Sequence, residues 1–188
     1  MNSLLGLKGM TSDSEVVRRL VAALTLKVQA SQVRLDSDAS SAALYGLKNM
    51  SSFHSEVRVL ISALLDKALP VSQSVGERQV AMALLSLHGK RSEHAEVRRL
   101  VAALIPFVRA CQGPLLPAAA ASIMNSIQHL KSEHEEVLEL VAALVPMIEA
   151  SRQKMTPVQA QRALWGLKKM SSKHSAISTM TEILRRGL

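Results

Sequence analysis

Side chains that can stack, hydrogen-bond or carry positive charge recur at three places in this sequence, at intervals of 40 residues. Each place is numbered by the residue of the second copy that occupies it. Position 45 holds Leu5, Tyr45, Leu85, Asn125 and Trp165; position 48 holds Lys8, Lys48, His88, Gln128 and Lys168; position 49 holds Gly9, Asn49, Gly89, His129 and Lys169. Rings stack on unpaired bases, amides bond to base edges, and lysines neutralise phosphates.

Positions 48 and 49 follow position 45 by three and four residues, so on a helix they form one stripe with it, which we name the first-helix stripe. If the helices that carry it line the concave side of the molecule, the stripe can hold a ligand. The candidate binding residues are Lys8, Tyr45, Lys48, Asn49, His88, Asn125, Gln128, His129, Trp165, Lys168 and Lys169. The alternative is that Tyr45, Leu85 and Trp165 pack against the next unit, as large side chains at helical spacing commonly do. The sequence leaves both interpretations open.

The elements that position the stripe are internal repeats. Residues 43–54 (ALYGLKNMSSFH) and 163–174 (ALWGLKKMSSKH) are nearly identical, and the parts of them that begin at Gly46 and Gly166 have counterparts in the same register that begin at Gly6, Ser86 and Ser126. A second signature, RRLVAAL at 18–24, returns at 58–64, 98–104 and 138–144. Similarity at a fixed period near 40 residues is typical of stacked helical arrays.

Each unit carries two amphipathic helical patterns. We expect helices over about 1–10, 12–31, 37–50, 53–69, 77–90, 93–112, 117–130, 133–151, 157–170 and 173–186. Thr156 before Pro157 predicts a helix start, Ser132 with Glu135 has capping-box spacing, and Pro106 and Pro146 should kink or end their helices. The prediction is an all-α, right-handed α-solenoid of five tandem hairpins, a single array with units 1–35, 36–75, 76–115, 116–155 and 156–188.

The first unit begins in the middle of its first helix, which suggests a piece of a longer array. Apolar residues lie at both ends of the array, including Leu4, Leu5, Ile183 and Leu184, whereas solenoids usually end in units with a polar outer face. We therefore expect self-association through these open apolar ends.

Composition excludes few function classes. Hydrophobic residues make up 48% of the chain, but it has only two Phe, one Tyr and one Trp, so the core must be aliphatic. No apolar run reaches the roughly 18 to 20 residues of a membrane helix, and no secretory signal is evident, so we expect a soluble protein without membrane insertion. The single Cys111 forms no internal disulfide and fits a reducing compartment, whether cytoplasm, organelle or the destination of an exported effector.

The recurring His54, His94, His134 and His174 cannot share a metal ion. Successive copies should lie about one helix-packing distance apart, roughly 9 Å, while zinc ligands all lie about 2.1 Å from one ion. We expect these residues in the turn that starts each second helix. Recurring arginines, Arg18, Arg19, Arg58, Arg98 and Arg99, suit anions or simply mark a solvated helix face. No unique catalytic set stands outside the repeat, so we predict neither an enzyme nor a cofactor.

ALWGLKKM (163–170) after TPVQAQR, in a 40-residue helical hairpin, resembles the octotricopeptide repeat family, whose repeats open with a stretch like an ALWAL helix. That family is similar to the pentatricopeptide class of RNA-binding α-solenoids. The resemblance covers all five units and implies recognition of RNA. SIMNSIQHL (122–130) departs from the Trp-bearing pattern, and the repeat is slightly longer than is usual in the family.

Charge is uneven along the array. The formal net charge is +8, with +3, −1, +3, −2 and +5 in successive units. A groove that follows a phosphate backbone gains affinity from each phosphate that it neutralises. The acidic fourth unit therefore favours the alternative function, a scaffold that binds a peptide or helix of a partner protein. The leading expectation is a non-catalytic module that binds single-stranded RNA along the first-helix stripe.

Overall fold

The structure is a computed structural model that describes residues 2–71, 74–186 and 188. The first helices of the five units are α1 (Asn2–Gly6), α3 (Ser37–Gly46), α5 (Glu77–Leu85), α7 (Pro117–Ser126) and α9 (Pro157–Gly166). The second helices are α2 (Glu15–Ala30), α4 (Ser55–Lys67), α6 (Ala95–Arg109), α8 (Glu135–Glu149) and α10 (Ser175–Arg185). A short 3-10 helix, η1 (Leu7–Gly9), follows α1.

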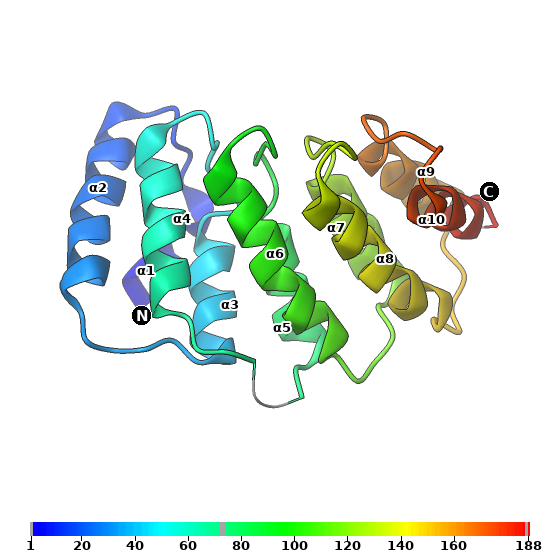
Figure 1. The fold of residues 1–188 in the computed structure, drawn as a ribbon, viewed down its shortest axis with the longest axis horizontal. Coiled ribbons are helices and arrows are strands. Elements are labelled where there is room, and N and C mark those ends of the chain that lie inside the picture. Colours follow the sequence, from blue (N-terminus) through cyan, green and yellow to red (C-terminus); the bar gives the residue numbers. More distant parts are fainter. Residues whose placement is uncertain (1, 72–73, 187) are drawn as a thin grey trace.

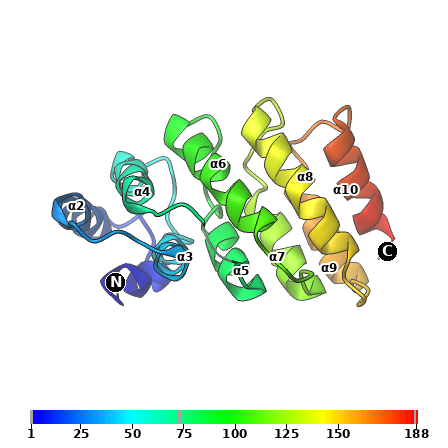
Figure 2. The same ribbon diagram turned by 60° about the horizontal axis from the view of Figure 1, so that its bottom comes forward.

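The helices form two layers, with the units side by side in sequence order (Figure 1). In the turned view the first helices α3, α5, α7 and α9 lie along one side, and the second helices α2, α4, α6, α8 and α10 lie along the other (Figure 2). Each first helix packs on the first helix of the adjacent unit, and each second helix on the adjacent second helix. This arrangement confirms the predicted all-α repeat fold.

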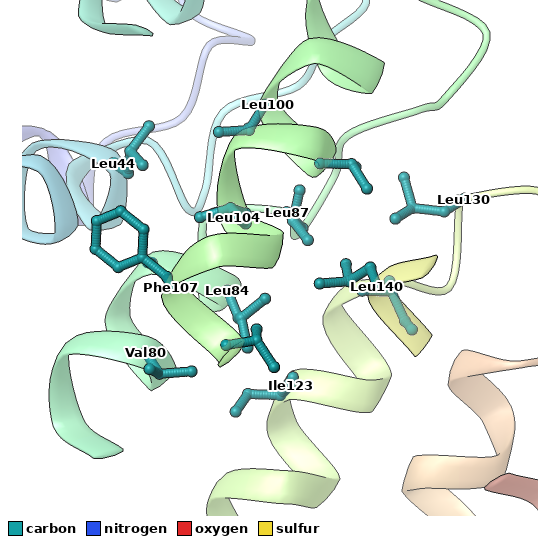
Figure 3. Close-up of a cluster of buried hydrophobic side chains, with 14 of the residues drawn as sticks. Leu44, Val80, Leu84, Leu87, Leu100, Leu104, Phe107, Ile123, Leu130 and Leu140 are labelled. Atoms are coloured by element: carbon teal, nitrogen blue, oxygen red, sulfur yellow. The ribbon is translucent and has the colours of Figure 1, made fainter. Parts of the chain in front are cut away.

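The core lies between the two layers and is aliphatic, as the composition predicts. Leu84 and Val80 of α5, Leu104 and Phe107 of α6, and Ile123 of α7 gather in one continuous cluster (Figure 3). The repeat makes this cluster periodic, because the same position is buried in several units; position 44 is Leu44, Leu84 and Met124, and position 60 is Leu60, Leu100, Leu140 and Met180.

The first helices end earlier than predicted. They were expected to reach position 50, but α3 ends at Gly46, and the next residues form a tight turn in which the N–H of Leu47 donates to the carbonyl of Leu44 at 2.9 Å. Bonds of this i to i+3 type commonly tighten the last turn of a helix. Positions 48 and 49 therefore lie in the turn that follows the first helix, and only position 45 lies on the helix itself.

Both internal prolines lie inside continuous helices, because α6 extends past Pro106 to Arg109 and α8 extends past Pro146 to Glu149. A proline removes the hydrogen bond to the carbonyl four residues before it. That carbonyl belongs to Ala102 in α6, which is exposed along with Pro106, so water can reach it. The prolines are tolerated because they lie on the outer side of the second layer.

A buried serine joins each unit to the next. The hydroxyl oxygens of Ser12, Ser52, Ser92 and Ser132 accept hydrogen bonds from the backbone N–H groups at position 51 of the following unit, at 2.8, 3.0, 2.9 and 2.9 Å. The prediction that Ser132 caps a helix is wrong, since His134 holds the N-cap position of α8. The capping prediction at Thr156 is confirmed, because its hydroxyl accepts from the N–H of Gln159 at 3.3 Å.

The recurring arginines at position 58, namely Arg18, Arg58 and Arg98, support the same turn. Arg58 donates to the carbonyls of Ser52 at 2.7 Å and Phe53 at 2.9 Å, and Arg18 and Arg98 make the equivalent bonds in their own units. These guanidinium groups are half-buried, so a solvated helix face does not describe them. Arg19 and Arg99, at the next position, are exposed, and Arg99 forms an ion pair with Asp66 at 2.5 Å.

Glycine at position 46 allows two first helices to approach closely. A Cβ atom built on Gly166 of α9 would lie 1.8 Å from the carbonyl oxygen of Met124 in α7, and one on Gly46 would lie 2.0 Å from the carbonyl oxygen of Leu4. In the fourth unit Ser126 holds this position, and its hydroxyl donates to the carbonyl of Leu84 in α5 at 3.1 Å. The array thus has glycine junctions and serine junctions.

We expect Gly166→Ala to lower the free energy of unfolding by about 1–3 kcal/mol, because the added methyl group forces α7 and α9 apart. The matched control is Gly9→Ala, where no atom lies within 4 Å of the added Cβ and the glycine φ is not positive. Chemical denaturation followed by circular dichroism measures both variants. Equal stability of the two alanine variants would show that the close approach is not required.

Candidate nucleic-acid interface

The first-helix stripe runs along the edge of the array that is formed by the turns between first and second helices. None of its eleven candidate residues is buried. Lys8, Asn49, His88, Trp165, Lys168 and Lys169 are exposed, and Tyr45, Lys48, Asn125, Gln128 and His129 are half-buried. The side chains are thus accessible at the surface, although they lie at the ends of the first helices and in the following turns instead of along one helix face.

Trp165, Lys168 and Gln128 form a cluster across the junction between the fourth and fifth units. Residue Trp165 is 57% exposed, and the ammonium group of Lys168 lies 3.9 Å from the centroid of its ring. The indole N–H donates to Oε1 of Gln128 at 3.1 Å, and Lys168 donates to the same oxygen at 3.4 Å. These contacts fix the orientation of the ring while leaving much of its surface open to solvent.

The second unit repeats this pairing of a ring with a cation. The ammonium group of Lys48 lies 4.6 Å from the Tyr45 ring centroid and donates to the Tyr45 hydroxyl at 3.0 Å. In the following turn the Asn49 amide donates to the backbone carbonyl of Lys8 at 2.7 Å, across the junction with the first unit. The Asn49 side chain therefore already has a structural partner on one side.

The two histidines of the stripe report a positive electrostatic environment. Burial and the nearby cations Lys90, Arg162 and Lys48 lower the pKa of His88. Burial also lowers the pKa of His129, together with Lys169, Arg91, Lys168 and His88. Both imidazoles are therefore neutral at pH 7. The cations that act on them come from three units, the second, third and fifth, so positive charge from several units gathers at this edge.

Three residues that the sequence analysis did not select belong to the same edge. The guanidinium group of Arg91 lies 4.1 Å from the ring centroid of Phe53, which is 61% exposed. Arg162 acts on His88 from the fifth unit. A signal for Phe53 existed, because the equivalent residues Asp13, Glu93, Glu133 and Lys173 are all charged. Arg91 and Arg162 come close only through the fold.

Lys90 is a fully buried cation beneath the centre of the stripe. Its ammonium group donates to the carbonyls of Leu47 at 2.8 Å and Met50 at 2.6 Å in the preceding unit, and to that of His88 at 3.0 Å. Burial lowers the pKa of Lys90 to about 7, since removal from water disfavours the charged form. Position 50 is Met or Leu in the other units, so this lysine breaks the apolar pattern of the repeat.

The acidic residues of the fourth unit lie mostly in the other layer. Glu135, Glu136, Glu139 and Glu149 belong to α8, a second helix. Glu139 pairs with Arg109 of α6 at 2.7 Å, and Glu149 pairs with Arg186 at 3.5 Å. Glu139 and Glu149 therefore serve contacts within the second layer, whereas Glu133, at the position equivalent to Phe53, is an exposed carboxylate of the turn edge.

The recurring histidines lie where they were expected, at the start of the second helices. His54, His94, His134 and His174 hold the N-cap positions of α4, α6, α8 and α10. In the described part of the chain, no group of three or more His, Cys, Asp or Glu side chains is arranged to hold a metal ion. Within the same residues, no helix has the length and apolar character needed to cross a bilayer.

Together the fold and this edge define a helical-repeat protein with an exposed row of rings and cations. Comparison of the chain with models of known protein families, with curated proteins and with solved structures finds no match. The resemblance to the octotricopeptide repeat family accordingly stays a prediction that rests on the repeat motif alone.

We expect the free energy of unfolding to rise with pH between about 7 and 10.5, the folded and ordinary pKa values of Lys90. In this interval the unfolded chain binds the proton that the folded chain has released, so the slope approaches about 1.4 kcal/mol per pH unit. Below pH 7 the ammonium is charged in both states, and its burial is most costly. Lys90→Met should raise stability at pH 7 and flatten the slope in denaturant titrations at several pH values. The same slope in both proteins would contradict this assignment.

Proposed function

We propose that this protein is a non-catalytic module that binds single-stranded RNA along the first-helix stripe. The observation that carries the proposal is the row of cations beside exposed rings, which continues across the junctions between units. Trp165 with Lys168 and Tyr45 with Lys48 repeat the same pairing at two places in the row. Single-stranded nucleic acid is bound by this combination, a positive track for the backbone and rings for the bases.

The side chains at equivalent positions of the stripe differ from unit to unit, as a protein that distinguishes one base from another requires. Position 45 is Tyr45, Asn125 or Trp165 in three of the units, while the serines and apolar residues that join the units stay nearly constant. Helical repeats that read one base per unit use two or three such variable side chains. The resemblance of ALWGLKKM to octotricopeptide repeats supports the same assignment.

The alternative is a scaffold that binds a peptide or helix of a partner protein. The acidic fourth unit was its main support in the sequence, and the ion pairs of Glu139 and Glu149 with arginines in the second layer weaken that support. The alternative predicts no binding of nucleic acid even at low salt.

We expect the full chain to bind random single-stranded RNA with an affinity that falls steeply as salt rises. Replacing Lys48 and Lys168 by alanine should reduce the slope of log K against log salt by about 0.7 for each phosphate that the variant no longer neutralises. The control replaces Lys27 and Lys154, which are exposed near the opposite ends of the second helices, and changes the net charge equally. If both double variants bind RNA equally weakly, net charge and not the stripe is responsible; absence of binding at low salt overturns the proposal.

Tryptophan fluorescence reports on the site directly, because Trp165 is the only tryptophan in the chain. We expect RNA to quench its fluorescence as a base stacks on the exposed ring. Trp165→Ala should weaken binding by about 1–3 kcal/mol, the usual contribution of one stacked base. Unchanged fluorescence at saturating RNA would exclude Trp165 from the interface.

A further inference from the structure

The first unit exposes a face that every later unit buries. Leu20, at position 60, is 40% exposed, whereas the equivalent Leu60, Leu100, Leu140 and Met180 are fully buried. Val17 and Leu24 on the same face of α2 are half-buried, while their counterparts in the later units are buried. The exposure follows from position in the array, because these side chains point toward the place that a preceding unit would occupy.

Gly6 also belongs to this exposed face of the first unit, because the space beside it is open where the equivalent glycines have a close neighbour. At Gly46 and Gly166, the equivalent glycines, a Cβ atom would lie within 2.0 Å of a carbonyl oxygen of the preceding unit. No atom lies within 4 Å of a Cβ built on Gly6. The first unit therefore has the open space for a glycine junction without a neighbour that fills it.

The fifth unit exposes the complementary half of a junction. Ser172 continues the series of Ser12, Ser52, Ser92 and Ser132, which are buried and accept the N–H of the next unit. The Ser172 side chain is exposed. Leu164 holds position 44, whose carbonyl receives the glycine at the two glycine junctions.

We propose that the first unit of one molecule docks on the fifth unit of a second copy of this chain, in the register of the internal junctions. The hydroxyl of Ser172 accepts the backbone N–H of Thr11, Gly6 packs on the carbonyl of Leu164, and Leu20 becomes buried. A second copy fits because each half of the junction is present on this chain, and because the contact continues an interface that already recurs along the array.

An interface of this head-to-tail kind does not close on itself, so it produces a series of oligomers instead of a single dimer. The two end units carry net charges of +3 and +5 and repel each other. Salt screens that repulsion, so association should strengthen as salt rises. Binding of RNA has the opposite salt dependence, and self-association does not rest on the proposed function.

The test is sedimentation velocity of the full chain without RNA, over a range of protein concentrations and at low and high salt. We expect the weight-average mass to rise above 20.4 kDa with concentration, without a plateau at the dimer mass. Gly6→Ala and Leu20→Glu should both keep the protein at 20.4 kDa, since one fills the glycine space and the other charges the apolar face. The control is Leu26→Glu, on the same helix, because Leu26 is exposed but lies outside the buried positions of the junction.

Circular dichroism verifies that each variant keeps its helical content. A monomer at all concentrations overturns the proposal, and so does association that persists in Gly6→Ala and Leu20→Glu. The register is tested separately by cysteines at Thr11 and Ser172 in a Cys111→Ser background. Disulfide-linked ladders in the doubly substituted protein, and not in either single variant, are the expected result; no ladder from a protein that associates would refute this register.

Discussion

The array depends on the hydrogen bond between a buried serine hydroxyl and the backbone N–H at position 51 of the next unit. Leaving such a buried hydroxyl without its partner costs about 1–3 kcal/mol, so neighbouring units cannot slide past each other by one residue without a penalty. At the other edge, the N–H groups of Leu35, Val75 and Leu115 bond to carbonyls at the ends of the second helices of the next unit, at 2.9, 3.1 and 3.0 Å. With both edges fixed in this way, equivalent side chains of successive units form a row.

The spacing within that row is set by what stands at position 46. A glycine allows the carbonyl of the preceding unit to occupy the place of a side chain, whereas Ser126 keeps that carbonyl at hydrogen-bonding distance. The three stripe contacts that cross a junction, from Asn49 to Lys8 and from Trp165 and Lys168 to Gln128, all occur at glycine junctions. Close approach of the first helices therefore brings stripe residues together, while the serine junctions in the middle leave His88 and His129 among cations.

Periodicity made most of the fold predictable, because a residue that recurs every 40 positions must do the same structural work in each unit. The helices, their order and the apolar core follow from it. The structural role of each recurring residue was not predictable. The serine series was visible in the sequence, but its hydrogen bonds join residues 39 positions apart, so the sequence analysis assigned Ser132 to a helix cap instead. The ends of the first helices were predicted too late because an amphipathic pattern continues through the turn at Leu47. For the site, sequence located the variable positions, but the convergence of Arg91 and Arg162 on them requires the fold.

Lys90 links the interior of the array to this surface. Its ammonium group is held by carbonyls from two units, and it is one of the charges that lower the pKa of His88 on the stripe. The attraction between an anion on the stripe and a buried ammonium acts through a medium of low polarity, where it is screened less than between surface charges. If the stripe binds an anion as proposed, that anion would raise the pKa of Lys90, and by linkage the charged form of Lys90 would strengthen the binding. Since the pKa of Lys90 in the folded chain is about 7, such a coupling would act near neutral pH. A methionine at the same position, as in three of the other units, would pack equally well but could not provide it.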